Sequence, residues 1–363
     1  MVNSSNVVAI EAGQALEKRI PVTVLTGYLG AGKTTLLNRI LSEDHGRRYA
    51  VIVNEFGEIG IDNDLIVSTD EELFEMNNGC ICCTVRGDLI RTLHGLLARG
   101  GNFDAIIVET TGLADPGPVV QTFFVDHFLQ ARTVLDSVTT LVDAKHILLR
   151  LADSREAVEQ IAFADQIVLN KTELVSEDEL RAIESRLKKI NSLAPVHRSQ
   201  RANVDLAKVL GRGAFDIEHI VSLEPDFLTP ADADAAHVHD EHCEHEHDHQ
   251  HDSGIHSISL ISTLPMDGAR ISDWLNALVA SKGADILRAK GIIDVMGEDR
   301  RLVFQAVHML LEGDYQRLWT AQEARCSRLV FIGRNLDQAA LETGFKSCVA
   351  VDPIQLEDKR WSH

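Results

Sequence analysis

Short apolar runs alternate with amphipathic stretches through the first half of the chain. Ile20–Leu25 is an apolar run of β type, the glycine-rich Gly27–Gly32 follows it, and Lys33–Leu41 has apolar residues at helical spacing. Further strands are predicted at Tyr49–Val53, Ala105–Val108, Val138–Val142 and Gln166–Leu169, and further helices at Leu89–Ala98 and Ser176–Ile190. Strands that alternate with helices predict an α/β fold with a mostly parallel sheet covered on both faces.

The pattern changes near residue 231. Residues 231–256 hold eight histidines and eight acidic residues, and their apolar residues are few and small. Such a segment buries too little surface to fold alone, so we predict a flexible linker. Beyond it, Asp267–Leu287 is helical in pattern, and Leu336–Phe345 predicts a last helix. Strands are predicted between them and before them, at Ile258–Ile261, Ile292–Val295, Leu302–Val307 and Arg328–Ile332, which suggests a small α+β domain.

The glycine-rich segment after the first strand carries a phosphate-binding motif. Gly27-Tyr-Leu-Gly30-Ala-Gly32-Lys33-Thr34 matches the P-loop pattern G-x4-G-K-[ST], placed between a strand and a helix. Backbone amides of such a loop converge on phosphate oxygens, the lysine adds positive charge, and the threonine hydroxyl binds Mg²⁺. The predicted phosphate-binding residues are Gly27, Gly30, Ala31, Gly32, Lys33, Thr34 and Thr35.

Two further segments complete the predicted nucleotide site. Ile106-Ile-Val-Glu109-Thr-Thr-Gly112 is an apolar strand that ends in a carboxylate, which in P-loop proteins reaches Mg²⁺ directly or through water. Gly112 lets the backbone follow the γ-phosphate. Asn170-Lys171-Thr172-Glu173 follows another strand and resembles the guanine-reading N-K-x-D element of GTPases, with Glu173 in place of the aspartate.

A cysteine cluster lies between these elements, at Asn77-Asn-Gly-Cys80-Ile-Cys82-Cys83. Three thiolates this close can chelate a cation such as Zn²⁺, with a fourth position left for a carboxylate, histidine or water. Glu58 and the region of Asp88 are acidic enough to join. Two alternatives stay open, namely buried cysteines that fill a core and a redox switch.

In this order the segments T-G-Y-L-G-A-G-K-T-T, N-E-F-G-E-I-G-I-D, N-N-G-C-I-C-C, V-E-T-T-G-L-A-D-P and N-K-T-E resemble the CobW-type metallochaperone GTPases. The resemblance covers nearly the whole chain and is greatest to the bacterial YjiA-like branch. It implies a P-loop GTPase domain at 20–225 after an N-terminal extension at 1–19. It also implies a His/acid-rich segment at 226–256, a CobW-like C-terminal α+β domain at 257–350 and a tail at 351–363.

The resemblance also implies an activity and its residues. The protein is expected to hydrolyse GTP with Mg²⁺ and to couple hydrolysis to transfer of Zn²⁺, or of Co²⁺ or Ni²⁺, to a client metalloprotein. Cys80, Cys82 and Cys83 are the implied metal ligands, with Glu58 as an extra one. The expected catalytic residues are Lys33, Thr34 and Glu109. The candidates for orienting the attacking water are Glu55 and Glu58.

The histidines of the linker have two interpretations. They buffer or deliver metal at weak, multiple sites, or they are incidental to a solvated linker. The predicted weak ligands are His237, His239, His242, His245, His247, His249 and His251. The other functions that we consider are a cobalt-handling accessory of cobalamin synthesis, a passive metal-storage protein and a small-metabolite kinase. A homodimer that forms conditionally is expected by analogy with related maturation GTPases.

Charge and hydropathy restrict the partners and the location. The formal net charge of −20 argues against nucleic acid and anionic membranes as partners, because a negative surface repels phosphate. No run of 18 or more apolar residues exists, and Met1–Arg19 has neither a basic start nor an apolar run. We therefore expect a soluble, cytoplasmic protein.

Overall fold

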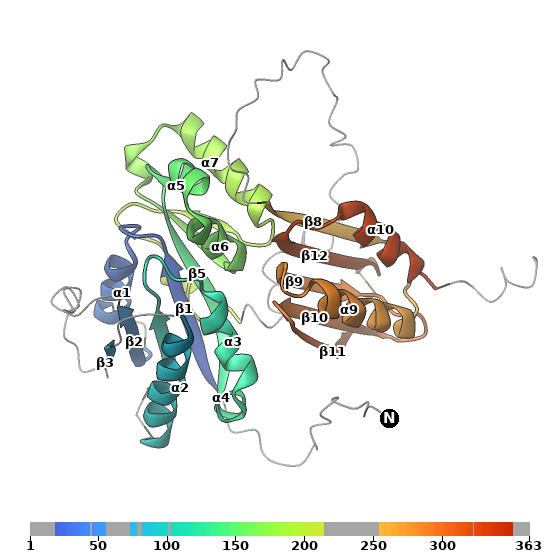
Figure 1. Cartoon of the computed structure of the whole chain (residues 1–363), viewed down its shortest axis with the longest axis horizontal. Coiled ribbons are helices and arrows are strands. Elements are labelled where there is room, and N and C mark those ends of the chain that lie inside the picture. Colours follow the sequence, from blue (N-terminus) through green and yellow to red (C-terminus); the bar gives the residue numbers. More distant parts are fainter. Residues whose placement is uncertain are drawn as a thin grey trace, which may run out of the picture.

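Two sheets make up the part of the chain that the computed structural model describes, which is residues 19–43, 46–55, 73–77, 82–100, 103–213, 254–321 and 323–350 (Figure 1). The first sheet and its helices are called the P-loop domain below, and the second sheet and its helices are called the C-terminal domain. The two lie against each other. Helices α6 (Arg155–Phe163) and α7 (Glu177–Ile190) of the first domain contact strand β8 (Ile255–Ser262) of the second.

The P-loop domain has a seven-stranded sheet in the order β3-β2-β4-β1-β5-β6-β7, in which every pair of neighbours is parallel. Its strands are β1 Ile20–Gly27, β2 Tyr49–Glu55, β3 Leu73–Asn77, β4 Ala105–Glu109, β5 Thr133–Asp143, β6 Gln166–Asn170 and β7 Val196–Arg198. The predicted α/β class with a mostly parallel sheet is confirmed. The carboxyl ends of β1, β4 and β6 carry the three predicted nucleotide-binding segments, so the topology places these segments at one edge.

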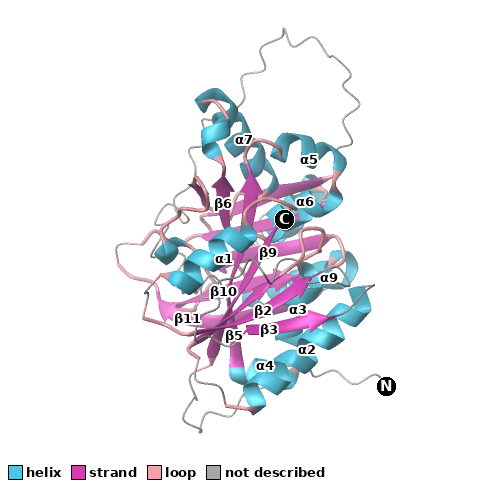
Figure 2. Cartoon of the chain, turned by 90° about the vertical axis from the view of Figure 1, so that its left-hand side faces the viewer, coloured by secondary structure: helices cyan, strands magenta, loops and turns pink. Residues whose placement is uncertain are grey.

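Helices cover both faces of this sheet (Figure 2). They are α1 Lys33–Ser42, α2 Cys82–Ala98, α3 Gly117–Val125, α4 His127–Arg132, α5 Ile147–Asp153, α6 Arg155–Phe163 and α7 Glu177–Ile190. Leu36, Leu37 and Ile40 of α1 pack on one face, together with Leu25 of β1. The buried residues of the other six helices form a separate cluster on the opposite face.

Local sequence signals set where the best-defined helix begins. Ser176 caps α7 by accepting a hydrogen bond from the amide of Glu179, and the Glu179 carboxylate accepts one from the amide of Ser176. This capping box satisfies amides that have no partner inside the helix. Acidic residues in the first turn and Lys188 and Lys189 in the last turn also suit the helix dipole. The helix predicted at this serine is confirmed.

The C-terminal domain has a five-stranded antiparallel sheet in the order β11-β10-β9-β12-β8. Its elements are β8 Ile255–Ser262, α9 Gly268–Lys282, β9 Ile286–Ile293, β10 Arg300–Val307, β11 Leu310–Leu318, β12 Ser327–Arg334 and α10 Gln338–Ser347. Helices α9 and α10 pack on one face (Figure 1). On the other face Leu287, Val307 and Ile332 join the hydrophobic cluster of the P-loop domain.

The clearest differences from the predicted elements lie around residue 285. The helix expected at Asp267–Leu287 ends at Lys282, and the strand expected at Ile292–Val295 is the end of β9, which begins at Ile286. The helix expected at Leu89–Ala98 also begins earlier, at Cys82. All eight residues of β9 are buried, including Arg288 and Lys290. Two cationic residues inside a short apolar run hide the pattern of a buried strand. They are tolerated because both form ion pairs with Asp165 of the P-loop domain.

Among the described helices, none is both long enough and apolar enough to cross a bilayer.

Candidate nucleotide site

The P-loop is a tight connection between β1 and α1. Gly27, Gly30 and Gly32 have positive φ angles of 141°, 72° and 109°, which L side chains rarely adopt. A Cβ atom on Gly27 would also lie 2.3 Å from the carbonyl oxygen of Leu141 on the neighbouring strand β5. The loop therefore requires glycine for its turn and for its contact with β5. Ala31 of the loop is fully buried, whereas Thr35 on α1 is exposed.

Lys33 and Thr34 begin α1 and face different parts of the loop. The ammonium group of Lys33 donates to the carbonyl oxygens of Gly27 at 2.8 Å and Tyr28 at 3.4 Å, so it lies over the loop that is predicted to hold phosphates. The hydroxyl of Thr34 lies 3.5 Å from Oε1 of Glu109. Glu109 ends β4 and pairs in register with Leu25 of β1. A hydroxyl and a carboxylate side by side at the mouth of the loop are oxygen ligands that suit Mg²⁺.

The segment after β4 packs directly on the P-loop. Thr110 donates its amide to the carbonyl of Leu25 at 2.9 Å and its hydroxyl to Thr26 at 2.8 Å. A Cβ atom on Gly112 would lie 2.7 Å from the backbone nitrogen of Leu29. Only glycine permits this approach. The predicted γ-phosphate segment and the predicted phosphate loop therefore form one packed unit.

Asn170 joins the P-loop to a segment that no motif predicted. Its side-chain amide donates to the carbonyl of Ala31 at 2.9 Å, and its carbonyl oxygen accepts from the amide of Ala202 at 2.8 Å. Ala202 is buried and has a positive φ of 57°. Arg39 of α1 holds the same segment by donating to the carbonyls of Ala202 and Val204. Asn170 thus ties together the loops on both sides of the expected base position.

Lys171 is fixed by a carboxylate at the end of β5. Its ammonium group lies 2.7 Å from Oδ2 of Asp143, and Nδ1 of His146 lies 3.0 Å from the same oxygen. Burial alone would raise the pKa of Asp143, but hydrogen bonds from Lys171 and His146 outweigh it and hold the pKa below its usual value. Asp143 is therefore ionised at neutral pH and keeps Lys171 at the site. Glu173, the other charged residue of this element, is exposed.

The predicted metal site lies mostly outside the described residues. Helix α2 begins at Cys82 and includes Cys83, but the side chains of both, the whole of Cys80 and the histidines His237–His251 are not described. Glu58 is also outside the described residues, and Glu55 is described only as the last residue of β2. Asp88 is described: it is 5% exposed and pairs with Arg91 of α2. Among the described side chains, no group of three His, Cys, Asp or Glu residues is placed to hold a metal ion.

Sequence reasoning missed the side chains that brace the site. Asp143 had a usable signal, since it directly follows an apolar parallel strand. No sequence signal pointed to Arg39, Ala202 or Gln160, whose side chain donates to the carbonyl of Gly112. Each of these residues acts through a contact with a segment distant in the sequence.

Three features define a P-loop nucleotide-binding protein. They are a phosphate loop on a parallel sheet, an acidic residue at the end of the adjacent strand, and an asparagine that bonds to the loop from the side where the base is expected. The chain belongs to the CobW/HypB/UreG family, whose nucleotide-binding domain matches residues 21–198. The cobalamin synthesis protein cobW C-terminal domain matches residues 255–349. The family resemblance seen in the sequence is confirmed.

Similar proteins agree over most of their length. The zinc chaperone YjiA of Escherichia coli is 38% identical over 331 residues, which are 90% of this chain and 98% of that protein. The zinc-regulated GTPase metalloprotein activator 1 of Schizosaccharomyces pombe is 33% identical over 87% of this chain and 83% of its own. A crystal structure of a Zn(II)-bound YjiA GTPase, with one glutamate and two cysteines replaced by alanine, has a TM-score of 0.72 and 32% identity. It covers 92% of this chain and 100% of that one.

Proposed function

We propose that this protein is a GTP-hydrolysing metallochaperone that couples hydrolysis to the transfer of Zn²⁺ to a client protein. The observation that carries hydrolysis is the pairing of Thr34 with Glu109 beside a P-loop whose lysine is in place. Mg²⁺ bound there would neutralise charge on the β- and γ-phosphates. Lys33 would bind the outer phosphates, and Thr34 and Glu109 would orient the metal ion. The backbone amides of residues 30–35 would make the remaining phosphate contacts.

Guanine as the base is supported by the way Asn170 and Lys171 are held. Asn170 bridges Ala31 and Ala202, and Asp143 fixes Lys171, so this side of the site is rigid before a base arrives. Glu173 follows in the position of the base-reading acid and is one methylene longer than aspartate. Because Glu173 is exposed, its carboxylate is not packed in the core and can turn toward the base.

Zinc as the cargo is supported by the residue types and by the relatives. Cys80, Cys82 and Cys83 are soft ligands that suit Zn²⁺, and Glu58 would be a fourth ligand. Two relatives carry zinc in their names, and the zinc-bound relative was altered at a glutamate and at cysteines, which are the same residue types. His237–His251 would supply weaker sites that collect metal. Co²⁺ and Ni²⁺ share these ligand preferences.

The proposed coupling runs through the position of the cysteines. Helix α2 begins at Cys82 and so lies, in sequence, between the segments that end β2 and β4. GTP that orders Asn54–Asp62 and Glu109–Asp115 would change the geometry at Cys80–Cys83. The client metalloprotein would take the metal in one nucleotide state, and a homodimer would form under the same control. The division into a P-loop domain at 20–225 and a C-terminal domain at 257–350 is part of this proposal.

Linkage between zinc and nucleotide tests the proposal. The Kd for Zn²⁺ is expected to differ between the protein loaded with a non-hydrolysable GTP analogue and Mg²⁺ and the protein loaded with GDP. The Kd for the analogue should change with zinc by the same factor, about 5- to 150-fold. Isothermal titration measures both. A variant that lacks residues 237–251 should bind fewer zinc ions yet keep the factor, and equal zinc affinities in both nucleotide states would contradict the coupling.

A further inference from the structure

Helix α6 holds the segment that follows Glu109. The side-chain amide of Gln160, which is 1% exposed, donates to the carbonyl oxygens of Gly112 and Ala114, each at 3.1 Å. These two bonds hold the peptide planes that follow Gly112 and Ala114. Gly112 in turn packs on the backbone of Leu29 in the P-loop. A movement of this segment must therefore break both bonds or move α6.

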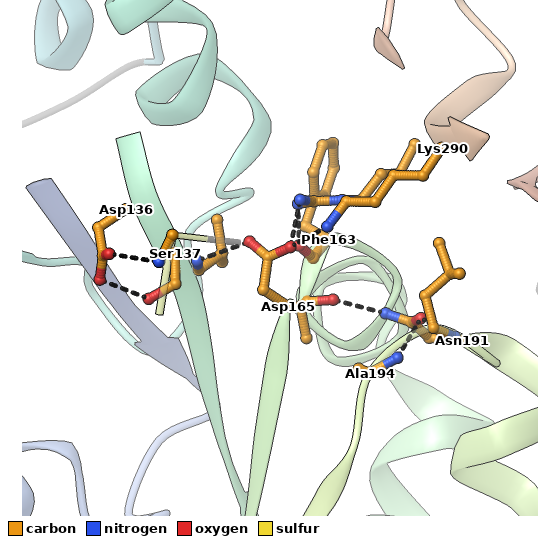
Figure 3. Close-up of polar contacts among 12 residues, drawn as sticks. Asp136, Ser137, Phe163, Asp165, Asn191, Ala194 and Lys290 are labelled. Carbon is orange, nitrogen blue, oxygen red and sulfur yellow. Dashed lines mark hydrogen bonds and ion pairs between the residues drawn. The ribbon is translucent and has the colours of Figure 1, made fainter. Parts of the chain in front are cut away.

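The end of the same helix is anchored to the C-terminal domain by buried charges. Asp165, two residues after the end of α6, is 1% exposed in its side chain and pairs with Arg288 and with Lys290, the latter at 2.7 Å. Arg288 also donates to the carbonyl of Phe163 at 2.8 Å. Figure 3 shows Lys290 reaching Asp165 beside Phe163, at the point where the two domains meet. Buried charges lose much solvation and tolerate few arrangements, so this end of α6 has a defined position.

Three further contacts tie α6 and the start of α3 to the C-terminal domain. Glu159, next to Gln160 and 4% exposed, pairs with Arg334 at the end of β12. His308, in the turn between β10 and β11, contacts the Phe163 ring at a tilt of 48°, with ring centroids 5.2 Å apart. A Cβ atom on Gly117 would lie 2.8 Å from Nε2 of His308, so this turn contacts the start of α3 as well.

We propose that Gln160 is a positioning residue for GTP hydrolysis, which acts by orienting the Gly112–Ala114 segment. Through α6 it links the nucleotide state to the docking of the C-terminal domain. The inference rests on the proposed GTP hydrolysis. Two hydrogen bonds from the Gln160 side chain and the buried ion pairs of Asp165 beyond the C-terminal end make α6 a connection between the Gly112–Ala114 segment and the second domain. A nucleotide that favours one position of the segment then favours one position of the domain, and the coupling is reciprocal.

Gln160→Met keeps the length and the apolar contacts of the side chain and removes both donors. We expect kcat for GTP to fall about tenfold, the loss that follows from one or two hydrogen bonds. The Kd for GDP should stay within about twofold, because Lys33 and Asn170 are untouched. Gln130→Met is the matched control: Gln130 also donates to a backbone carbonyl, that of Phe124, but lies away from the nucleotide segments. A Kd for GDP that weakens in step with kcat would show general damage and overturn the proposal.

Hydrogen exchange separates this coupling from GTP hydrolysis itself. The amides of β9, Ile286–Ile293, should exchange at different rates with a non-hydrolysable GTP analogue and with GDP, and Gln160→Met should abolish that difference. Arg334→Met removes the partner of Glu159 from the other domain, and the Arg334 side chain is partly exposed. This variant should also reduce the difference in exchange, and it should lower kcat about threefold. Equal exchange in both nucleotide states of the wild type, or a difference that persists in Gln160→Met, would overturn the proposal. A wild type that shows the difference but no hydrolysis would refute the proposed function and the role of Gln160 in hydrolysis, and would leave the link between nucleotide and C-terminal domain through α6 standing.

Discussion

Lys33→Ala is expected to lower GTP hydrolysis by about 10²–10³-fold, the usual cost of removing one charge-stabilising group from a transition state. The side chain begins α1 and lies over the loop, where it bonds to the carbonyls of Gly27 and Tyr28. Without it, the outer phosphates lose the positive charge that the loop amides alone do not supply. Phosphate release measured at saturating GTP gives the change in kcat, and titration with GTP gives the change in affinity.

The fold should survive this substitution, because the three glycines of the loop set its shape and α1 packs through Leu36, Leu37 and Ile40. Lys189→Ala, an exposed residue on α7, serves as a matched loss of one lysine and should change neither quantity. Hydrolysis that persists at the wild-type rate in a folded Lys33→Ala protein would place the nucleotide elsewhere.

Asp165→Ala is expected to destabilise the protein by about 3–5 kcal/mol, because it leaves two buried cations without their shared carboxylate. Arg288 and Lys290 are 1% and 6% exposed in their side chains. Burial lowers the pKa of Arg288, which shows how poorly this position solvates a charge. Denaturant unfolding followed by intrinsic fluorescence measures the loss.

Two comparisons make that result specific. Asp178→Ala removes a carboxylate that pairs with Arg181 but is 89% exposed, and it should cost less than about 0.5 kcal/mol. Replacing Asp165, Arg288 and Lys290 together by leucine, methionine and methionine should recover most of the lost stability, since no charge stays buried. A loss in Asp165→Ala no larger than in Asp178→Ala would mean that the ion cluster does not hold the domains together.

The sequence predicted the parts of the fold whose signal is local. The P-loop motif predicts a strand, a turn and a helix together, because its glycines and lysine occur in the turn between a strand and a helix. The helix at Ser176–Ile190 was equally readable from its capping serine and its apolar spacing. The sequence predicted only the end of β9, through the strand expected at Ile292–Val295. The earlier part of β9 was missed because Arg288 and Lys290 are buried against Asp165, a partner 123 and 125 residues earlier in the chain. No local pattern contains that information.

The short helices α3–α6 were missed for a related reason. Helix α3 is apolar on most sides, and α6 buries seven of its nine residues, including Glu159 and Gln160. Helix α3 has no polar stripe opposite its apolar residues, and α6 is short and buries charged and polar side chains that resemble a solvated face in the sequence. The candidate site divides in the same way. Motifs predicted Lys33, Thr34, Glu109 and Asn170, whereas Gln160 depends on the long-range packing of α6 against the Gly112–Ala114 segment.

The most direct measurement of the central claim is GTP hydrolysis by the purified protein with and without stoichiometric Zn²⁺, repeated on a variant with Cys80, Cys82 and Cys83 replaced by alanine. Cys348→Ala, at a buried cysteine of the C-terminal domain, controls for the loss of a thiol. We predict that zinc changes the rate in the wild type and in Cys348→Ala and has no effect in the triple variant. A rate that is the same with and without zinc, and the same in all three proteins, would contradict the claim that hydrolysis and metal are coupled.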